Sequence, residues 1–173
     1  MGFATVRITP TLDTGTAYID GDVLFVNTEF SLPAKKAKVV DAYIIDYEKQ
    51  LGSTDAQVYF MSKNVANLGT LNATADISDA NLRSNRVQGV LRHETQVNES
   101  PRLDNANIFR LHNVNVTGES SGNAFGFPIS LVLHSEGPSD SNANPMYVSA
   151  IVNGSVSAIA SADSLEIVLS LEY

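Results

Sequence analysis

Residues Pro145 to Tyr173 read PMYVSAIVNGSVSAIASADSLEIVLSLEY. This stretch holds two apolar runs, Met146–Val152 and Leu165–Leu171, joined by a segment rich in glycine, serine and alanine. In the second run, apolar side chains at every other position alternate with mostly polar ones. Successive side chains of a strand point to opposite faces, so this period of two predicts a strand with one face on a core and the other in water. We interpret it as the closing strand of a β-sandwich or barrel.

The composition limits the class of protein. The chain has 173 residues, of which 43% are hydrophobic and 17% are charged, which is enough for one domain with its own core. It has no cysteine, which excludes disulfides and thiolate metal sites. No apolar run approaches the roughly 20 residues needed to span a bilayer, and the N-terminus lacks a signal-peptide layout. We therefore expect a soluble, non-exported protein with no membrane partner.

The charge is acidic overall but unevenly distributed. The formal net charge is −8, and an acidic surface repels phosphate backbones, which argues against a nucleic-acid partner. Five of the six arginines fall in one segment, and no lysine or arginine follows it. The segment is a candidate for docking on an acidic neighbour, while a solvated loop face is the more ordinary interpretation. The candidate contact residues are Arg83, Arg86, Arg92, Arg102 and Arg110.

Short β-type segments recur along the whole chain. Besides the two C-terminal runs, the expected strands are Phe3–Thr9, Val23–Thr28, Lys38–Tyr47, Gln57–Met61, Arg86–His93, Ile108–Val116 and Phe127–His134. We expect Lys38–Tyr47 and Gln57–Met61 to form a hairpin, and Ser78–Leu82 to form an N-capped helical turn. The pattern predicts an all-β fold, an antiparallel β-sandwich (jelly-roll-like) or a barrel, with at most one short helix. Residues 1–15 are expected to form an N-terminal strand or arm, and residues 16–173 a single β-sandwich domain.

Two features of the sequence raise the question of catalysis or metal binding. Gly118–Gly122 matches the hydrolase pattern G-x-S-x-G, but a strand rather than the required helix is expected after it, so a polar turn is the better interpretation. His93, His112 and His134 could converge on zinc, although their wide spacing is not typical of a metal site. We predict no catalytic residue, and hence no enzyme.

Three aspartates near the N-terminus raise the question of calcium. Asp13, Asp20 and Asp22 offer oxygen ligands, but Asp-Gly-Asp is also a common turn sequence. We expect turns here, and we predict neither a metal ion nor a cofactor for the protein.

Several segments carry a resemblance to a group of tailed-phage structural proteins. Thr16–Val23 resembles the "A-Y-x-x-G-D-V" opening of that group, and Ile77–Leu82 resembles its "I-S-D-A-[DN]-L" turn. Near the end, Met146–Val152 and the turn Ser161–Leu165 resemble "L-Y-x-x-[LIV]-V" and "[ST]-A-x-x-L". The likeness covers most of the chain from Thr16 onward, and its motifs are turns and core strands rather than catalytic residues.

The resemblance implies a virion structural protein. Such proteins are similar to decoration (cement) proteins, so it implies a homotrimer, made in the bacterial host cytoplasm, that binds the outer surface of the major capsid protein shell and stabilises it. The first ten residues would act as an arm on the shell. The chain departs from the group in its longer segment Arg83–Arg110. Two alternatives stay open: a carbohydrate-binding β-sandwich of a head fibre or adhesin, with tyrosines as sugar platforms, and a tail or head-completion subunit.

Overall fold

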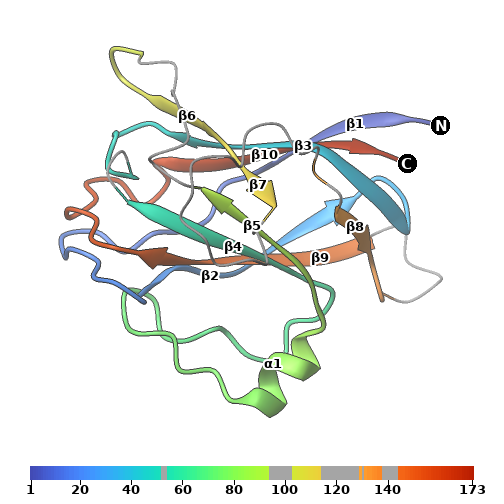
Figure 1. The fold of residues 1–173 in the computed structure, drawn as a ribbon, viewed down its shortest axis with the longest axis horizontal. Coiled ribbons are helices and arrows are strands. Elements are labelled where there is room, and N and C mark those ends of the chain that lie inside the picture. The colour runs from blue at the N-terminus through green and yellow to red at the C-terminus, as the bar shows by residue number, and fades with distance from the viewer. Residues whose placement is uncertain (52–53, 94–102, 114–128, 130, 138–143) are drawn as a thin grey trace.

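The computed structural model describes residues 1–51, 54–93, 103–113, 129, 131–137 and 144–173. In these ranges the chain forms ten strands, joined by turns and loops, and one short helix (Figure 1). In chain order the elements are β1 Phe3–Ile8, β2 Val23–Leu32, β3 Lys36–Asp46, β4 Asp55–Met61, α1 Asp79–Asn85, β5 Val87–His93, β6 Asn107–Arg110, β7 His112–Asn113, β8 Leu131–His134, β9 Asn144–Asn153 and β10 Leu165–Glu172.

The strands form two antiparallel sheets that pack face to face (Figure 1). The first sheet has the order β1-β10-β3-β6, with β8 also paired to β3. The second sheet has the order β2-β9-β4-β5-β7. The predicted all-β, antiparallel β-sandwich with one short helix is therefore confirmed.

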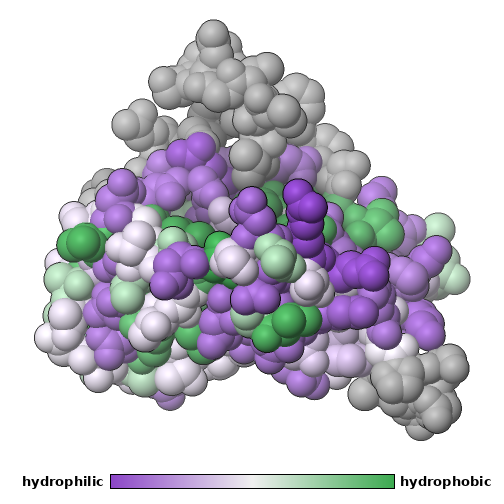
Figure 2. All heavy atoms as spheres, turned by 90° about the horizontal axis from the view of Figure 1, so that it is seen from below, coloured by the Kyte–Doolittle hydropathy of each residue, from purple (hydrophilic) through white to green (hydrophobic). Residues whose placement is uncertain are grey.

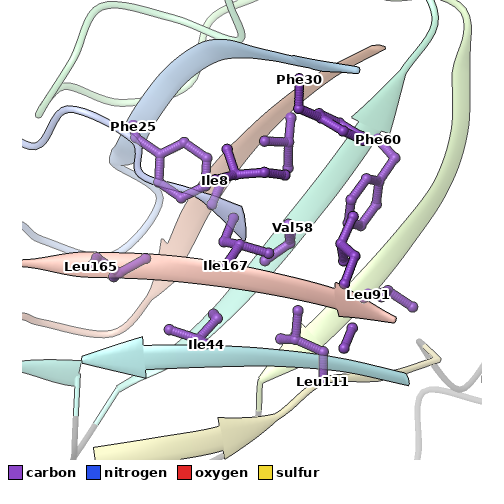
Figure 3. Packing of buried hydrophobic residues seen from close by; sticks show 14 of the residues in the cluster. Ile8, Phe25, Phe30, Ile44, Val58, Phe60, Leu91, Leu111, Leu165 and Ile167 are labelled. Carbon is purple, nitrogen blue, oxygen red and sulfur yellow. The ribbon is translucent and has the colours of Figure 1, made fainter. Parts of the chain in front are cut away.

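The core lies between the two sheets and follows the alternation seen in the sequence. In β10 the side chains of Leu165, Ile167, Leu169 and Leu171 are buried, as predicted. They face residues of the second sheet such as Phe30 and Phe60, whose rings meet edge to face at 6.3 Å (Figure 3). Each large apolar side chain buried in this way stabilises the fold by about 1.5–3 kcal/mol.

The predicted hairpin of Lys38–Tyr47 with Gln57–Met61 is wrong. β3 belongs to the first sheet and β4 to the second, so the connection between them crosses the sandwich. The buried carboxylate of Asp46 directs the chain at this point, because it accepts hydrogen bonds from the backbone N–H groups of Leu51 (2.7 Å) and Glu48 (3.1 Å). Burial raises the pKa of this carboxyl group.

Residues 62–86, between β4 and β5, form an excursion over the outer face of the second sheet. Its apolar residues join a small cluster with strand residues, made of Val23, Met61 and Leu68 together with Val26, Tyr59, Ala75, Ile77, Leu82, Tyr147 and Ile151. The predicted helical turn is confirmed as α1, with Ser78 as N-cap accepting a hydrogen bond from the N–H of Asn81. The excursion covers the part of the second sheet around Tyr59 and Tyr147.

At one edge of the sandwich the chain links the two sheets; we call the surroundings of β5, β6, β7 and β8 the closed edge. The expected strand Ile108–Val116 is divided there: β6 pairs with β3 in the first sheet, and β7 pairs with β5 in the second. The buried Leu111 lies at the crossing, and its N–H donates to the carbonyl of Ala42 (2.8 Å). Residues 114–116 lie outside the described residues.

A side chain makes a second link at the closed edge. The amide of Gln88 in β5 donates to the carbonyl of His134 in β8 and accepts from the N–H of the same residue, both at 2.6 Å. The side-chain amide of Gln88 thus makes the two hydrogen bonds that a neighbouring strand would otherwise make to the backbone of His134. These bonds connect the second sheet to the first.

At the opposite edge, the described residues show no side-chain link of this kind. β1 and β2 are the terminal strands of their sheets and are neighbours across the sandwich. The excursion occupies part of the edge of β2, since Val23 exchanges backbone hydrogen bonds with Asn72 and Ala73. β1 pairs along its length with β10 on one side only. We call its other side the open edge.

Candidate functional site

The four described arginines of the predicted contact set are carried by the end of α1 and by both sheets. Arg83 and Arg86 lie at the C-terminal end of α1. Arg92 points away from the core on the second sheet, because its neighbours Leu91 and His93 are buried. Arg110 lies on the outer face of the first sheet, and Arg102 lies outside the described residues. The set as a whole therefore stays a prediction, since only four of its five residues are described.

The end of α1 carries the most basic group of side chains in this set. Arg86 adopts a left-handed conformation (φ 56°) that ends the helix, and its side chain lies 3.9 Å from the carboxylate of Glu136. Lys63 lies 3.6 Å from the same carboxylate, and Arg83 is exposed in the last helical turn. Two cations share the carboxylate of Glu136, and Asp79 is the acidic residue of the first helical turn. We call Lys63, Arg83 and Arg86 the α1 cluster.

Buried hydrogen bonds hold the α1 cluster in place. The side chain of the buried Asn85 accepts from the N–H groups of Val65 and Ala66 and donates to the carbonyl of Ala66. The backbone of Lys63 donates to the carbonyl of Asn85 (3.1 Å). The cluster is thereby attached to the core of the excursion rather than to a free loop.

The outer face of the first sheet carries a different arrangement of charge around Asp41. Its carboxylate accepts from the guanidinium of Arg110 (2.9 Å) and from the hydroxyl of Tyr43 (2.5 Å). The hydrogen bond to Asp41 raises the pKa of Tyr43. The Arg110 side chain is 61% exposed, so this pair contributes little to stability.

A second group on the same face repeats this arrangement. The carboxylate of Glu166 accepts from the guanidinium of Arg7 (2.7 Å) and from the hydroxyl of Tyr47 (3.1 Å). Arg92, on the other sheet, likewise lies 3.2 Å from the carboxylate of Asp55. Each of these arginines faces a carboxylate of its own chain, whereas in the α1 cluster two cations share the single carboxylate of Glu136.

The open edge presents backbone groups rather than charge. Gly2 and Tyr173 exchange both backbone hydrogen bonds (2.7 and 3.0 Å), and the register then continues without a shift along β1 and β10. Hydrogen-bonded pairs alternate in an antiparallel ladder, so the N–H and C=O groups of Phe3, Thr5 and Arg7 point away from β10. The ring of Phe3 is 70% exposed beside them. An exposed edge of this kind is suited to pairing with another strand.

The three histidines considered for zinc are not brought together as a site. His93 is buried and its ring lies 4.1 Å from that of Phe109, and burial lowers its pKa to about 4. His112 is its neighbour on β7, while His134 is on β8, where its backbone bonds to Gln88. Among the residues that the structure describes, no group of three or more metal-ligating side chains is found.

The three aspartates considered for calcium accept hydrogen bonds from neighbouring loops. A carboxylate oxygen of Asp22 accepts from the N–H of Ile19 (2.8 Å), and one of Asp20 accepts from the N–H of Gly154 (2.9 Å). Asp13 accepts from the side chain of Asn72 (2.6 Å). Each carboxylate therefore has a structural role in joining loops.

Most of the tyrosines considered as sugar platforms are buried or packed against other side chains. Tyr18 is fully buried, and burial raises its pKa to about 12. Tyr59 and Tyr147 pack in the cluster beneath the excursion. Tyr43 and Tyr47 remain on the outer face of the first sheet, where both hydroxyls bond to carboxylates. The Gly118–Gly122 motif lies outside the described residues.

No helix in the described part of the chain is long and apolar enough to cross a membrane. Comparison with protein-family models, with curated proteins and with solved structures gives no match to this chain.

Sequence reasoning found the charged residues but missed the two features that organise these surfaces. The sequence pattern predicts no element at residues 66–77, although Leu68 and Ile77 in that segment pack in the cluster beneath the excursion. The alternation of Phe3, Thr5 and Arg7 was visible in the sequence, but which side of β1 stays unpaired depends on a partner strand more than 150 residues away.

Proposed function

We propose that the chain is a structural protein of a tailed-phage virion, a decoration (cement) protein that binds the outer surface of the major capsid protein shell and stabilises it. The sequence motifs in Thr16–Val23, Ile77–Leu82 and the C-terminal strands support this proposal. The structural observation that carries it is the α1 cluster, an exposed group of cations on the excursion of an acidic β-sandwich.

The face around α1 suits a polar contact. Figure 2, which views the molecule from the side where α1 lies, shows hydrophilic residues over most of the surface with apolar ones scattered among them. A contact of this kind gains specificity and encounter rate from charge complementarity, here with an acidic patch on the coat protein. The α1 cluster supplies the positive side of that contact.

The mechanism is mechanical rather than chemical. A protein that binds the assembled shell and not its free subunits shifts the equilibrium toward the shell by mass action. Many copies on one particle multiply a modest contact, because each bridges neighbours that are already held in place. A stable sandwich with a fixed contact group meets both requirements without an active site.

Binding to capsids stripped of accessory proteins tests the proposal. The purified full chain is expected to co-sediment with such capsids at hundreds of copies per shell and to raise the temperature at which they break. Retention on a glycan array without binding to capsids would refute the proposal in favour of the carbohydrate-binding alternative. A few copies in a ring at the portal would instead indicate a head-completion subunit.

A charge-reversal pair locates the contact. Arg83→Glu is expected to weaken binding to the capsid at least about tenfold, because it places a like charge against an acidic partner. Lys36→Glu makes the same change in charge at an exposed position at the start of β3 and is expected to bind normally. Equal loss in both variants would mean that net charge, and not the α1 cluster, determines binding.

A further inference from the structure

The open edge of β1 has features that the proposed capsid contact does not use. Three alternate residues, Phe3, Thr5 and Arg7, direct both backbone hydrogen-bonding groups away from the sheet, and all three side chains are exposed. Edge strands in soluble proteins are usually shielded by a loop, a bulge or an inward-pointing charge. β2, the neighbouring edge strand, is shielded in part by the excursion, at Val23 and Asn27, while β1 pairs with β10 without a shift in register.

Two copies of β1 have complementary side chains when they lie antiparallel to each other. If a second β1 lies antiparallel with Thr5 opposite the partner's Thr5, then Phe3 lies opposite the partner's Arg7 and Arg7 opposite the partner's Phe3. In this register each outward residue donates one backbone hydrogen bond and accepts one, because all three sit at hydrogen-bonding positions of the new ladder. The pairs are favourable ones: threonine with threonine, and Phe3 with Arg7. The Arg7 guanidinium donates to Glu166 of its own chain (2.7 Å) but its side chain stays 59% exposed, so its face remains accessible to the partner's ring.

Other registers of the same two strands fit less well. Centring the pair on Arg7 puts two guanidinium groups opposite each other and brings Pro10, which has no N–H, toward the ladder. Centring it on Phe3 leaves Arg7 beyond the end of the partner strand. A shift of one strand by a single residue turns N–H and C=O groups away from their partners. Centring the pair on Ala4 or Val6 keeps the outward groups paired but no longer places Arg7 opposite Phe3, so the Thr5-centred register is the one that combines the full set of backbone bonds with that pair.

We propose that the open edge binds a second copy of this chain, β1 against the partner's β1, in the register centred on Thr5. The first sheets of the two copies then form one continuous sheet across a two-fold axis. On the inner side, Ala4 lies opposite the partner's Val6, so the contact is apolar where it meets the two cores. The contact is independent of the proposed capsid contact, which involves α1 and a different part of the molecule (Figure 1).

The oligomer expected from this contact differs from the one that the resemblance implies. A two-fold contact uses the same patch on both copies and closes after two chains, whereas a trimer needs two different patches. The mass of the purified full chain in solution distinguishes them, since one chain has a mass of 18.5 kDa. Light scattering is expected to give twice that value at high concentration; three times that value, or a monomer at every concentration, would overturn the proposal.

Single cysteines test the register directly, because the natural chain contains none. In the proposed pair the Cα atoms of Thr5 and the partner's Thr5 are about 5.5 Å apart, within the range that a disulfide spans. Thr5→Cys is therefore expected to give a covalent dimer on mild oxidation. Phe3→Cys is the matched control: its two copies are displaced by four residues, about 14 Å, and are expected to stay monomeric.

Mixing two variants makes the test stricter. Phe3→Cys mixed with Arg7→Cys is expected to cross-link into the mixed dimer, although Phe3→Cys does not cross-link alone. Cross-linking of Phe3→Cys with itself as readily as Thr5→Cys would overturn the register, and failure of Thr5→Cys to cross-link would overturn the contact. Binding to capsids is measured separately, so either proposal can fail while the other stands.

A charge swap provides a test without cysteine. Phe3→Arg places two guanidinium groups opposite each other and is expected to weaken dimerisation at least about tenfold. Adding Arg7→Phe to the same chain restores an arginine opposite a phenylalanine and is expected to restore the dimer. Equal dimerisation of wild type and Phe3→Arg, or no recovery in the double variant, would overturn the proposed pairing.

Discussion

The two edges of this sandwich solve the same physical problem in opposite ways. A sheet ends with a row of backbone groups that need partners. At the closed edge those partners come from within the chain: the strand passes from the first sheet to the second at Leu111, and the amide of Gln88 pairs with the backbone of His134. At the open edge, Phe3, Thr5 and Arg7 leave their groups to water or to another molecule. The closed edge therefore stabilises the fold, whereas the backbone groups of the open edge are available to another strand.

The largest effect is expected from a cavity at the closed edge. Leu111→Ala removes a buried side chain at the crossing between the sheets and should lower the free energy of unfolding by about 3 kcal/mol. Val6→Ala, at the half-buried inner side of the open edge, should cost about 1 kcal/mol. Urea unfolding at a concentration where the chain is monomeric measures both. Equal costs would contradict the assignment of structural roles to the two edges.

The buried histidine of the closed edge predicts a dependence of stability on pH. Burial lowers the pKa of His93 to about 4, against about 6.5 when unfolded, with the charge of Asp55 opposing this shift and that of His112 adding to it. The unfolded chain therefore binds a proton more readily than the folded chain. Stability is complete above pH 6.5 and falls as the pH drops toward 4, by about 2–3 kcal/mol.

A comparison with His93→Gln isolates this effect. Burial raises the pKa of Asp46, which favours the folded state on acidification and so opposes the histidine. The difference in unfolding free energy between wild type and His93→Gln should shift against the wild type between pH 7 and pH 4.5. Parallel profiles for the two proteins over that range would show that His93 does not titrate as a buried group.

An intermediate effect is expected from the side-chain link at the closed edge. Gln88→Glu keeps the size of the side chain and the acceptor for the N–H of His134 but loses the donor to its carbonyl. An unpaired carbonyl beside a carboxylate should cost about 1–2 kcal/mol. Gln57→Glu, on the neighbouring strand β4, provides a control for adding a negative charge. A cost in Gln88→Glu no greater than in the control would show that the link adds no stability.

The smallest effect is expected at the open edge itself. Thr5→Pro removes an N–H that points away from β10, and proline is tolerated at such positions of edge strands, so the unfolding free energy of the monomer should change by less than about 1 kcal/mol. Val6→Pro removes an N–H that bonds to β10 and should cost about 3 kcal/mol. The same denaturation experiment measures both, and similar costs would mean that the assigned alternation of β1 is incorrect.

The parts of the fold that depend on local pattern were predictable from the sequence. The alternating run Leu165–Leu171 predicted β10 and its buried face, and Ser78 predicted the start of α1. The pairing of strands was not predictable in the same way. The turn after β3 looks like a hairpin turn, but the buried Asp46 sends the chain across the sandwich, and its burial depends on residues distant in sequence.

The candidate surfaces show the same limit. The sequence identified the arginines, because charge is visible without a structure. It did not separate Arg110, which serves Asp41, from the two cations that share Glu136, since those partners are brought together only by folding. It showed the alternation of β1 but not its free side, which is defined by the register with β10.

Amide hydrogen exchange, resolved by residue with NMR at two protein concentrations, tests the central claim most directly. In dilute solution the amides of Ala4 and Val6 should be protected by their bonds to β10, while those of Phe3, Thr5 and Arg7 exchange quickly. At high concentration the second set should become protected and the closed edge should not change. Protection of all five amides in the dilute monomer, or exchange of Thr5 that ignores concentration, would contradict an open edge that pairs with a second copy.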